Sequence, residues 1–129
     1  MTPFALLLTA LLFGGMTLFS FGFAAVLFKS FDAPTARRGI RGAFPYYYLW
    51  VIGNASLAGA VALAVNTMAG AMLIAIALTT IYARQVLMAQ INTASDAGDT
   101  GAFKRLHGIS VVLQLIQIGA AGWALMLLG

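Results

Sequence analysis

Long runs of apolar residues, separated by short polar stretches, dominate the chain, and four of these runs are long enough to cross a lipid bilayer. A spanning helix needs about 20 mostly apolar residues, because each residue adds about 1.5 Å and the hydrocarbon layer is about 30 Å thick. We predict transmembrane helices over residues 4–28, 46–65, 68–91 and 102–128. The sequence therefore predicts an all-α integral membrane protein, an antiparallel four-helix bundle formed by a single membrane domain, residues 1–129.

The polar residues between the runs predict where the helices begin and end. Residues 29–45 are expected to be a connection with at most one basic turn of helix on the membrane surface. Pro45 is expected to open the second helix, where a missing N–H costs little. Residues 92–101 are rich in turn formers and are expected to form a polar loop. Within it, Asp99 or Thr100 is the expected N-cap of the last helix.

All seven basic side chains lie at the first and third connections, and none lies at the second connection or at either end of the sequence. Because cytoplasmic loops carry an excess of Lys and Arg, we predict that both basic connections face the cytoplasm and both termini lie on the non-cytoplasmic side. No charge precedes Lys29, so the first run is expected to be a retained helix rather than a signal peptide. The net charge of +4 is explained by orientation and by anionic head groups rather than by nucleic acid. The basic residues are Lys29, Arg37, Arg38, Arg41, Arg84, Lys104 and Arg105.

Composition also indicates a membrane protein, and it excludes several kinds of chemistry. Of the 129 residues, 62% are apolar and 8% are charged, whereas a soluble domain has about 45–50% and about 25%. The absence of cysteine excludes disulfides, thiolate metal sites and cysteine nucleophiles. Asp32, Asp96 and Asp99 are the only acids, and all lie in predicted connections. Because no span carries a carboxylate that could orient a catalytic base, we expect no enzyme activity, no catalytic residues, no metal site and no cofactor.

Polar residues recur at helical spacing on the third and fourth predicted helices, and polar groups in hydrocarbon usually face other helices or a cavity. On the fourth helix, polar residues recur at positions i, i+3, i+7 and i+10, which places them on one face: His107, Ser110, Gln114 and Gln117. One interpretation is hydrogen bonding between helices. The other is a cavity, open to the cytoplasm near Arg84 and His107, that binds a small polar ligand or relays protons. We call these residues the polar seam: Arg84, Asn92, His107, Ser110, Gln114 and Gln117.

The chain resembles a family of small four-helix membrane proteins of unknown function, domain of unknown function 4149, which includes transmembrane protein 205 of animals. The similarity runs over nearly the whole chain, and its most specific motif is the F-x-x-L-H stretch at Phe103–His107. It implies four helices with matching positions at Arg84, Asn92, Phe103 and His107, and no established activity. The stretches that carry it are FGGMTLFSFGFAAVLFKSF (13–31), FPYYYLW (44–50), ARQVLMAQIN (83–92) and DAGDTGAFKRLHGISVVLQL (96–115).

This chain departs from the family pattern at two places. Asn92 is followed by Thr93, where family members often have Asn-Pro, and the fourth helix carries glutamines where they tend to carry asparagine. A looser similarity to copper-resistance membrane proteins of the D type lies in the first helix, with its adjacent Gly14 and Gly15. The His and Met ligands that copper needs are not evident in this sequence.

The sequence favours a binding or structural role, as an accessory subunit of a larger membrane complex or as a bundle that associates with itself. The expected surroundings are a lipid bilayer, and the alanine-rich, short-looped sequence favours a bacterial inner membrane. The alternative is a small transporter or ligand-binding membrane protein, which predicts that Arg84, Asn92, His107 and Gln114 line one cavity. A third hypothesis, a cofactor-bearing redox protein, predicts visible absorption by the pure protein.

Overall fold

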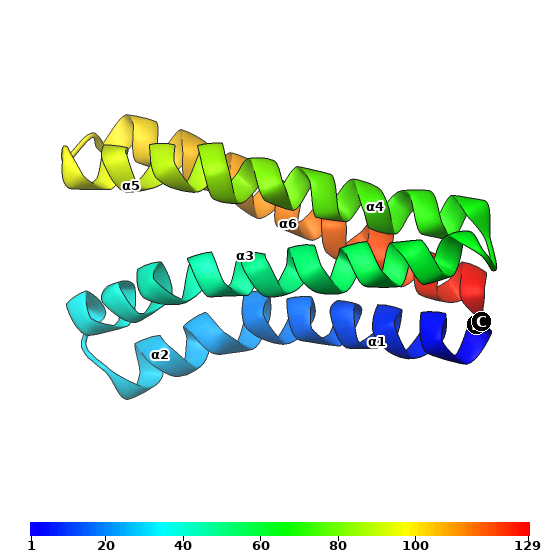
Figure 1. Cartoon of the computed structure of the whole chain (residues 1–129). Helices are drawn as coiled ribbons and strands as arrows, with labels where there is room; N and C mark the ends of the chain where they lie inside the picture. Colours follow the sequence, from blue (N-terminus) through cyan, green and yellow to red (C-terminus); the bar gives the residue numbers. More distant parts are fainter.

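The computed structural model describes all residues, 1–129, and consists of four long helical rods joined by short connections (Figure 1). Two of the rods contain a π-helical turn, named η1 or η2, between two α-helical segments. The first rod consists of α1 (Thr2–Leu18), η1 (Phe19–Phe23) and α2 (Ala24–Ser30), and the second is α3 (Ala33–Leu63). The third rod consists of α4 (Thr67–Tyr82), η2 (Ala83–Leu87) and α5 (Met88–Asp96), and the fourth is α6 (Thr100–Leu128).

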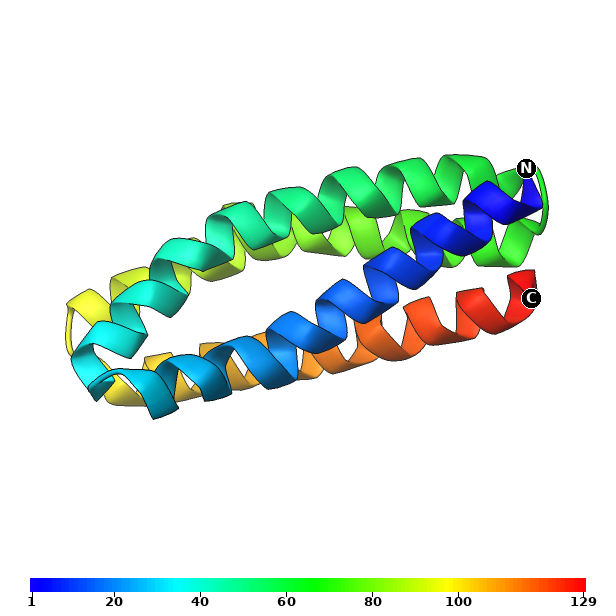
Figure 2. The same cartoon turned by 90° about the horizontal axis from the view of Figure 1, so that it is seen from below.

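Each rod has 29–31 residues and is long and apolar enough to cross a membrane. The predicted all-α class and the four apolar helices are therefore confirmed, and the chain is a multi-pass membrane protein. Consecutive rods run antiparallel, so both termini and the connection at 64–66 lie at one end of the bundle (Figures 1 and 2). The connections at 31–32 and 97–99 lie at the other end. We call these the terminal end and the basic end.

The helices extend further toward the basic end than the sequence predicts. α3 begins at Ala33, so the expectation of a connection over 29–45, with Pro45 as its helix opener, is wrong. Pro34 occupies the first turn of α3, where a proline fits, and Pro45 lies inside the helix. The third rod likewise stays helical to Asp96. Hydropathy marks the part of a helix that hydrocarbon covers, and these helices continue beyond that part with polar residues.

A tight turn replaces most of the loop that is expected over 92–101. Gly98 has a φ of +69°, a conformation that glycine adopts without strain. The N–H groups of Gly98 and Asp99 donate to carbonyl oxygens in the last turn of α5, at 3.2 and 3.0 Å, which is the pattern of a Schellman cap. Asp99 then accepts a hydrogen bond from the N–H of Ala102 at 3.1 Å, which identifies it as the N-cap of α6.

A continuous apolar core fills the terminal half of the bundle. Small residues let α3 and α4 approach each other closely there, because a Cβ added at Gly70 would lie 2.8 Å from the Cα of Leu63. Alanines occupy many of the other buried positions. The largest fully buried side chains of this core are Leu12, Met16, Val51 and Leu73.

The basic half has no such core, and its helices separate into two pairs (Figure 1). α2 packs against α3, and α5 packs against α6. The buried apolar residues outside the core cluster, Ala36, Leu87 and Ala94, do not form a second cluster. We call the two helix pairs the basic arms: α2 with residues 33–44 of α3, and α5 with residues 100–113 of α6.

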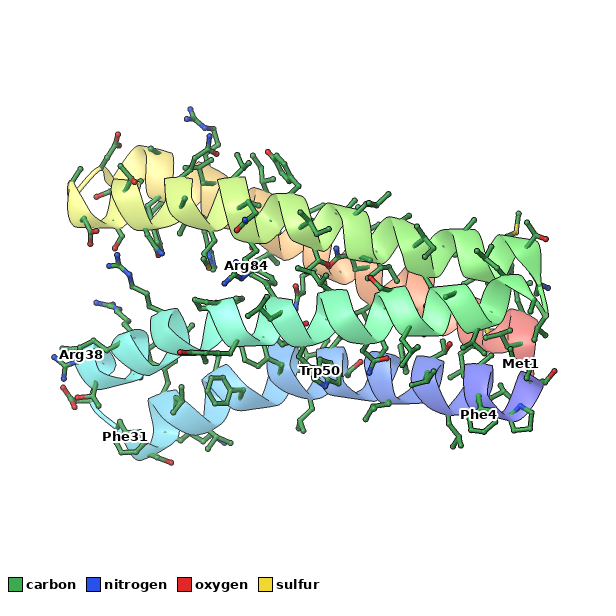
Figure 3. All side chains as sticks on the ribbon, in the orientation of Figure 1. Met1, Phe4, Phe31, Arg38, Trp50 and Arg84 are labelled. Atoms are coloured by element: carbon green, nitrogen blue, oxygen red, sulfur yellow. The ribbon has the colours of Figure 1, made fainter.

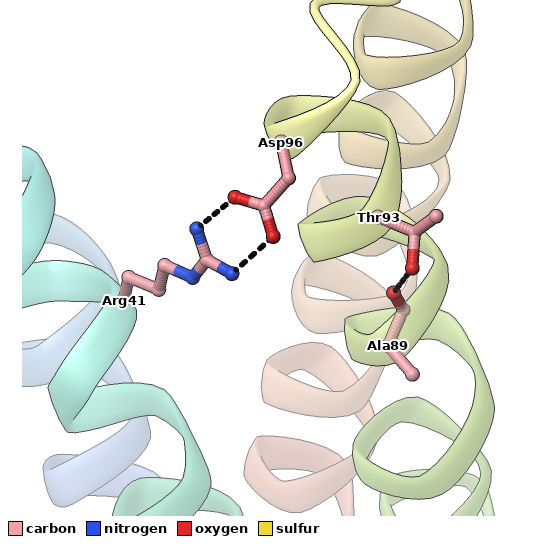
Figure 4. Close-up of polar contacts among 4 residues, drawn as sticks. All are labelled: Arg41, Ala89, Thr93 and Asp96. Atoms are coloured by element: carbon pink, nitrogen blue, oxygen red, sulfur yellow. Dashed lines mark hydrogen bonds and ion pairs between the residues drawn. The ribbon is translucent and has the colours of Figure 1, made fainter.

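One ion pair joins the two basic arms (Figure 4). Arg41 on α3 donates to Asp96 at the end of α5 through two parallel hydrogen bonds, at 2.7 and 3.0 Å. Both side chains are well exposed, at 47% and 63%. The neighbouring Thr93 donates to the Ala89 carbonyl of its own helix, at 2.9 Å, and makes no hydrogen bond to the other arm. The contact between the arms is therefore electrostatic and open to solvent.

Candidate functional site

Gln114 on α6 connects three of the four rods. Its Nε2 donates to the Ser20 hydroxyl in η1 at 2.7 Å and to the Tyr47 hydroxyl on α3 at 2.6 Å. Tyr47 is buried, and Gln114 and Ser20 are partly buried. A polar side chain at this depth is expensive unless it finds partners on other helices. Here the amide nitrogen of Gln114 finds two.

Gln117 lies one turn further along α6 and connects it to the third rod. Its Nε2 donates to the hydroxyls of Thr79 at 2.7 Å and Thr80 at 3.0 Å. Both hydroxyls also donate to carbonyl oxygens of their own helix, so each threonine accepts from Gln117 without losing its own acceptor. We call the combined set the polar layer: Ser20, Tyr47, Thr79, Thr80, Gln114 and Gln117.

Aromatic rings cover the polar layer where the first rod meets α3. Phe19 stacks on Tyr47 with ring centroids 3.8 Å apart and an angle of 6° between the rings. Phe44 packs edge-on against Phe19 at 5.2 Å, and Tyr48 tilts against Phe44 at 5.4 Å. The two Phe44 contacts have geometries in which aromatic pairs add to the gain from burial, and the stacked Phe19 ring limits where the Tyr47 hydroxyl can lie.

Arg84 lies beside the polar layer and has no carboxylate partner. Figure 3 shows its side chain extending from the third rod toward α3. Its Nε donates to the Pro45 carbonyl at 3.3 Å, and one of its terminal nitrogens donates to the Gln85 side chain at 3.0 Å. Arg84 is partly buried. It therefore binds a backbone oxygen that belongs to another rod.

The structure divides the polar seam instead of bringing it together. Gln114 and Gln117 belong to the polar layer, and Ser110 lies beside the Tyr48 hydroxyl. Asn92 is partly buried but makes no side-chain hydrogen bond, and His107 is exposed. No hydrogen bond joins Arg84, Asn92, His107 and Gln114 to one another.

His107 stands apart from the layer because it lies on a basic arm. Its ring stacks on Phe103, one turn earlier on α6, with centroids 5.6 Å apart and an angle of 5° between the rings. It makes no hydrogen bond to the turn between α5 and α6. Two shallow grooves on the surface, one between α5 and the start of α6 and one along α6, are lined by no residue of the polar seam.

The chemistry that this arrangement supports is hydrogen bonding between helices. No group of three or more His, Cys, Asp or Glu side chains comes together in the structure. Of the partners of the two glutamines, Ser20 and Thr80 are polar residues that helical spacing places on one side of their helices. Tyr47 and Thr79 escape the sequence pattern, because Tyr47 is typical of an interfacial aromatic residue and Thr79 does not follow the four-residue spacing of Thr80, Arg84 and Asn92. Two further buried polar atoms, Thr9 Oγ1 and Asn54 Oδ1, have no hydrogen-bond partner.

Comparison with known proteins yields one match. A family model described as "Domain of unknown function (DUF4149)" matches residues 7–100. No curated protein and no solved structure matches the chain. The family that the residues resemble is thus the family whose model matches.

Proposed function

The chain belongs to the DUF4149 family, a family without an assigned function, and from that premise we propose that it is a helix-packing membrane subunit without enzymatic activity. In this role it is an accessory protein that assembles with a larger membrane protein or with further copies of itself. The observation that carries the proposal is the use of the central polar groups. The amide nitrogens of Gln114 and Gln117 each bind hydroxyls of the chain's own helices, which supports a packing role over a binding role for the bundle centre.

The outer surfaces of the rods also support this proposal. On α3, Gly53, Ser56 and Ala60 are exposed, lie on one side of the helix and face away from the core. A Cβ added at Gly53 would meet no atom within 4 Å. Small residues on a membrane helix let another helix approach closely, so this face of α3 suits a neighbouring transmembrane helix.

The proposal includes an orientation. Six of the seven Lys and Arg residues lie on the basic arms, and the seventh, Arg84, lies in η2 beside the polar layer. The positive-inside rule therefore directs the basic end to the cytoplasm and both termini outward. A bacterial inner membrane is the proposed location. Cysteines introduced at Ser30 and at Thr67, each labelled with a membrane-impermeant maleimide in intact cells, test the orientation: labelling at Thr67 alone agrees with it, and labelling at Ser30 alone contradicts it.

Native mass spectrometry of the protein, extracted with its surrounding lipid, tests the packing role. We expect a stoichiometric complex with a larger protein or a homo-oligomer, which Gly53→Leu dissociates because the added side chain blocks the face of α3. Gly119→Leu on α6, which also replaces an exposed glycine with no neighbour within 4 Å, is the matched control. A chain recovered only as a monomer from its own membranes would overturn the proposal.

A second candidate function, binding of a small polar or anionic ligand, is favoured by one observation. Arg84 is partly buried beside the polar layer and has no carboxylate partner. A thermal-shift screen with small anions tests this candidate, with Arg84→Gln and the exposed Arg105→Gln as a matched pair. Stabilisation that Arg84→Gln abolishes and Arg105→Gln preserves would support a ligand role, and equal responses of both variants would remove it.

A further inference from the structure

Three irregularities of the helical backbone meet at one level of the bundle. η1 lies within the first rod, Pro45 lies inside the continuous helix α3, and η2 lies within the third rod. Phe19 in η1 stacks on Tyr47, two residues after the proline, and Arg84 in η2 donates to the Pro45 carbonyl itself. π-helical turns are rare and are frequently found at functional sites. Ordinary helix packing does not explain why two such turns contact the same proline-containing turn.

Each irregularity weakens the hydrogen bonding that keeps a helix straight. Pro45 has no N–H, so the carbonyl oxygen of Arg41 loses its donor four residues later. In η1 and η2 the hydrogen bonds follow the wider i→i+5 pattern. Sharp changes of helix direction occur at prolines and at such π-helical turns. Three of the four rods can therefore bend most easily at the same level.

The molecule differs on the two sides of this level. Toward the terminal end, the apolar core joins all four rods. Toward the basic end, each basic arm is held together internally, and the exposed Arg41–Asp96 ion pair joins the two arms. An exposed ion pair contributes little and is weakened by salt. The contact between the arms is thus the weakest of the contacts that hold the rods together.

We propose that η1, Pro45 and η2 form a hinge layer, about which the two basic arms open and close while the terminal half stays closed. The polar layer lies at the same level and keeps the four rods joined there through Gln114 and Gln117. The Arg41–Asp96 pair holds the closed form, because its two residues belong to opposite arms. This motion is independent of whether the protein packs against a partner.

The cysteine-free sequence makes the motion measurable by pairs of spin labels. Ser30→Cys with Ser95→Cys places one label on each basic arm, and Thr2→Cys with Thr67→Cys places both labels at the terminal end. All four positions are exposed. Distances are measured by double electron–electron resonance on the full chain in lipid nanodiscs, at low and high salt.

We expect a broad Ser30–Ser95 distance distribution that includes a component at longer distance, from molecules with open arms. We expect a narrow Thr2–Thr67 distribution. High salt or Arg41→Gln increases the longer component by about twofold to fivefold, the range that loss of one exposed ion pair allows. Pro45→Ala, which restores the missing N–H, narrows the distribution at the basic end. The terminal pair stays unchanged in every case.

Two outcomes would overturn the hinge layer. In the first, the Ser30–Ser95 distribution is as narrow as the terminal one and does not respond to salt, which describes a rigid bundle. In the second, Arg41→Gln broadens the distribution but Pro45→Ala leaves its width unchanged, which locates the motion away from Pro45. Because the salt titration uses a chain with an intact ion pair and proline, misfolding of a variant does not obscure the result.

Discussion

The terminal and basic halves of this bundle are built from the same four rods but are held together differently. In the terminal half, side chains such as Leu12 and Leu73 are fully buried, and Gly70 lets α3 and α4 touch. In the basic half the helices are held in pairs, and one exposed ion pair connects those pairs. The polar layer and the three backbone irregularities lie between the two halves.

We attribute the difference to the solvent that is expected around each half. Rods of 29–31 residues are about 45 Å long, whereas the hydrocarbon layer is about 30 Å thick. All charged side chains except Arg84, which lies beside the polar layer, belong to the basic arms or to the connections between their helices, so we assign the excess length to that end. Hydrocarbon favours close packing and satisfied hydrogen bonds, whereas water and head groups compete for the charges of the basic arms. We therefore infer that the rods pack closely where hydrocarbon surrounds them and separate into pairs where water and head groups do.

The largest expected effect is steric and lies in the terminal half. Gly70→Ala forces a Cβ to within 2.8 Å of the Leu63 Cα and 2.6 Å of its side chain, so α3 and α4 must move apart. We expect a loss of about 2 kcal/mol of unfolding free energy, as for other overpacked cores, measured by titration with sodium dodecyl sulfate.

Gly108→Ala on a basic arm is the matched control for this substitution. Its Cβ would meet no atom within 4 Å. We expect unchanged stability or a gain of up to about 1 kcal/mol from helix propensity. Equal losses at both glycines would show that the two halves are packed alike, which contradicts the comparison.

The next effect concerns the hydrogen bonds of the polar layer. Gln117→Leu removes the bonds to Thr79 and Thr80, but both hydroxyls keep their own backbone acceptors. We therefore expect a loss of only about 1 kcal/mol, within the range of hydrogen bonds between membrane helices, in the same titration. Gln90→Leu, at an exposed position on α5, is the control and should leave stability unchanged. A loss above about 3 kcal/mol would mean that a buried polar group had been left without a partner.

A smaller effect on stability is expected where α1 packs against the ring of Trp50. A Cβ at Gly15 would lie 2.2 Å from the far edge of the Trp50 ring, whereas a Cβ at Gly14 would meet nothing within 4 Å. Because Trp50 is 38% exposed, its ring can move outward and relieve the clash. We expect Gly15→Ala to shift the Trp50 fluorescence while it lowers stability by less than about 1 kcal/mol. The measurement uses a Trp123→Phe background, with Gly14→Ala as the silent control.

The sequence correctly predicted four long apolar helices, but it missed where α3 begins and which polar residues come together. Hydropathy and periodicity show to which side of its own helix a side chain points. They therefore placed Gln114 and Gln117 on the inner face of α6. Periodicity does not show which residues of the other helices lie at the same level along the bundle axis. His107 shares the face of Ser110 and Gln114 but lies beyond the level at which the arms separate, and it is therefore exposed.

Hydropathy also fails to predict where the helices end, because it detects only their apolar parts. The run from Ala33 to Phe44 has too many charges and small residues to be read as a span, yet it is helical because Pro34 suits a first turn and nothing before Pro45 interrupts the backbone. The π-helical turns have no sequence signature that would reveal them. Only the structure shows them, together with the contacts that Phe19 and Arg84 make with the turn around Pro45.

The smallest expected effect is that of the Arg41–Asp96 pair on stability. Both side chains are exposed, at 47% and 63%, so water competes for each charge. In a double-mutant cycle of Arg41→Gln and Asp96→Asn, we expect a coupling energy of about 0.5 kcal/mol at low salt that disappears at high salt. Arg38→Gln with Asp96→Asn is the control cycle and should show no coupling, because Arg38 donates within its own helix to Thr35. A coupling above about 2 kcal/mol that survives high salt would show that the arms are held as firmly as the terminal half, and the contrast between the two halves would then be wrong.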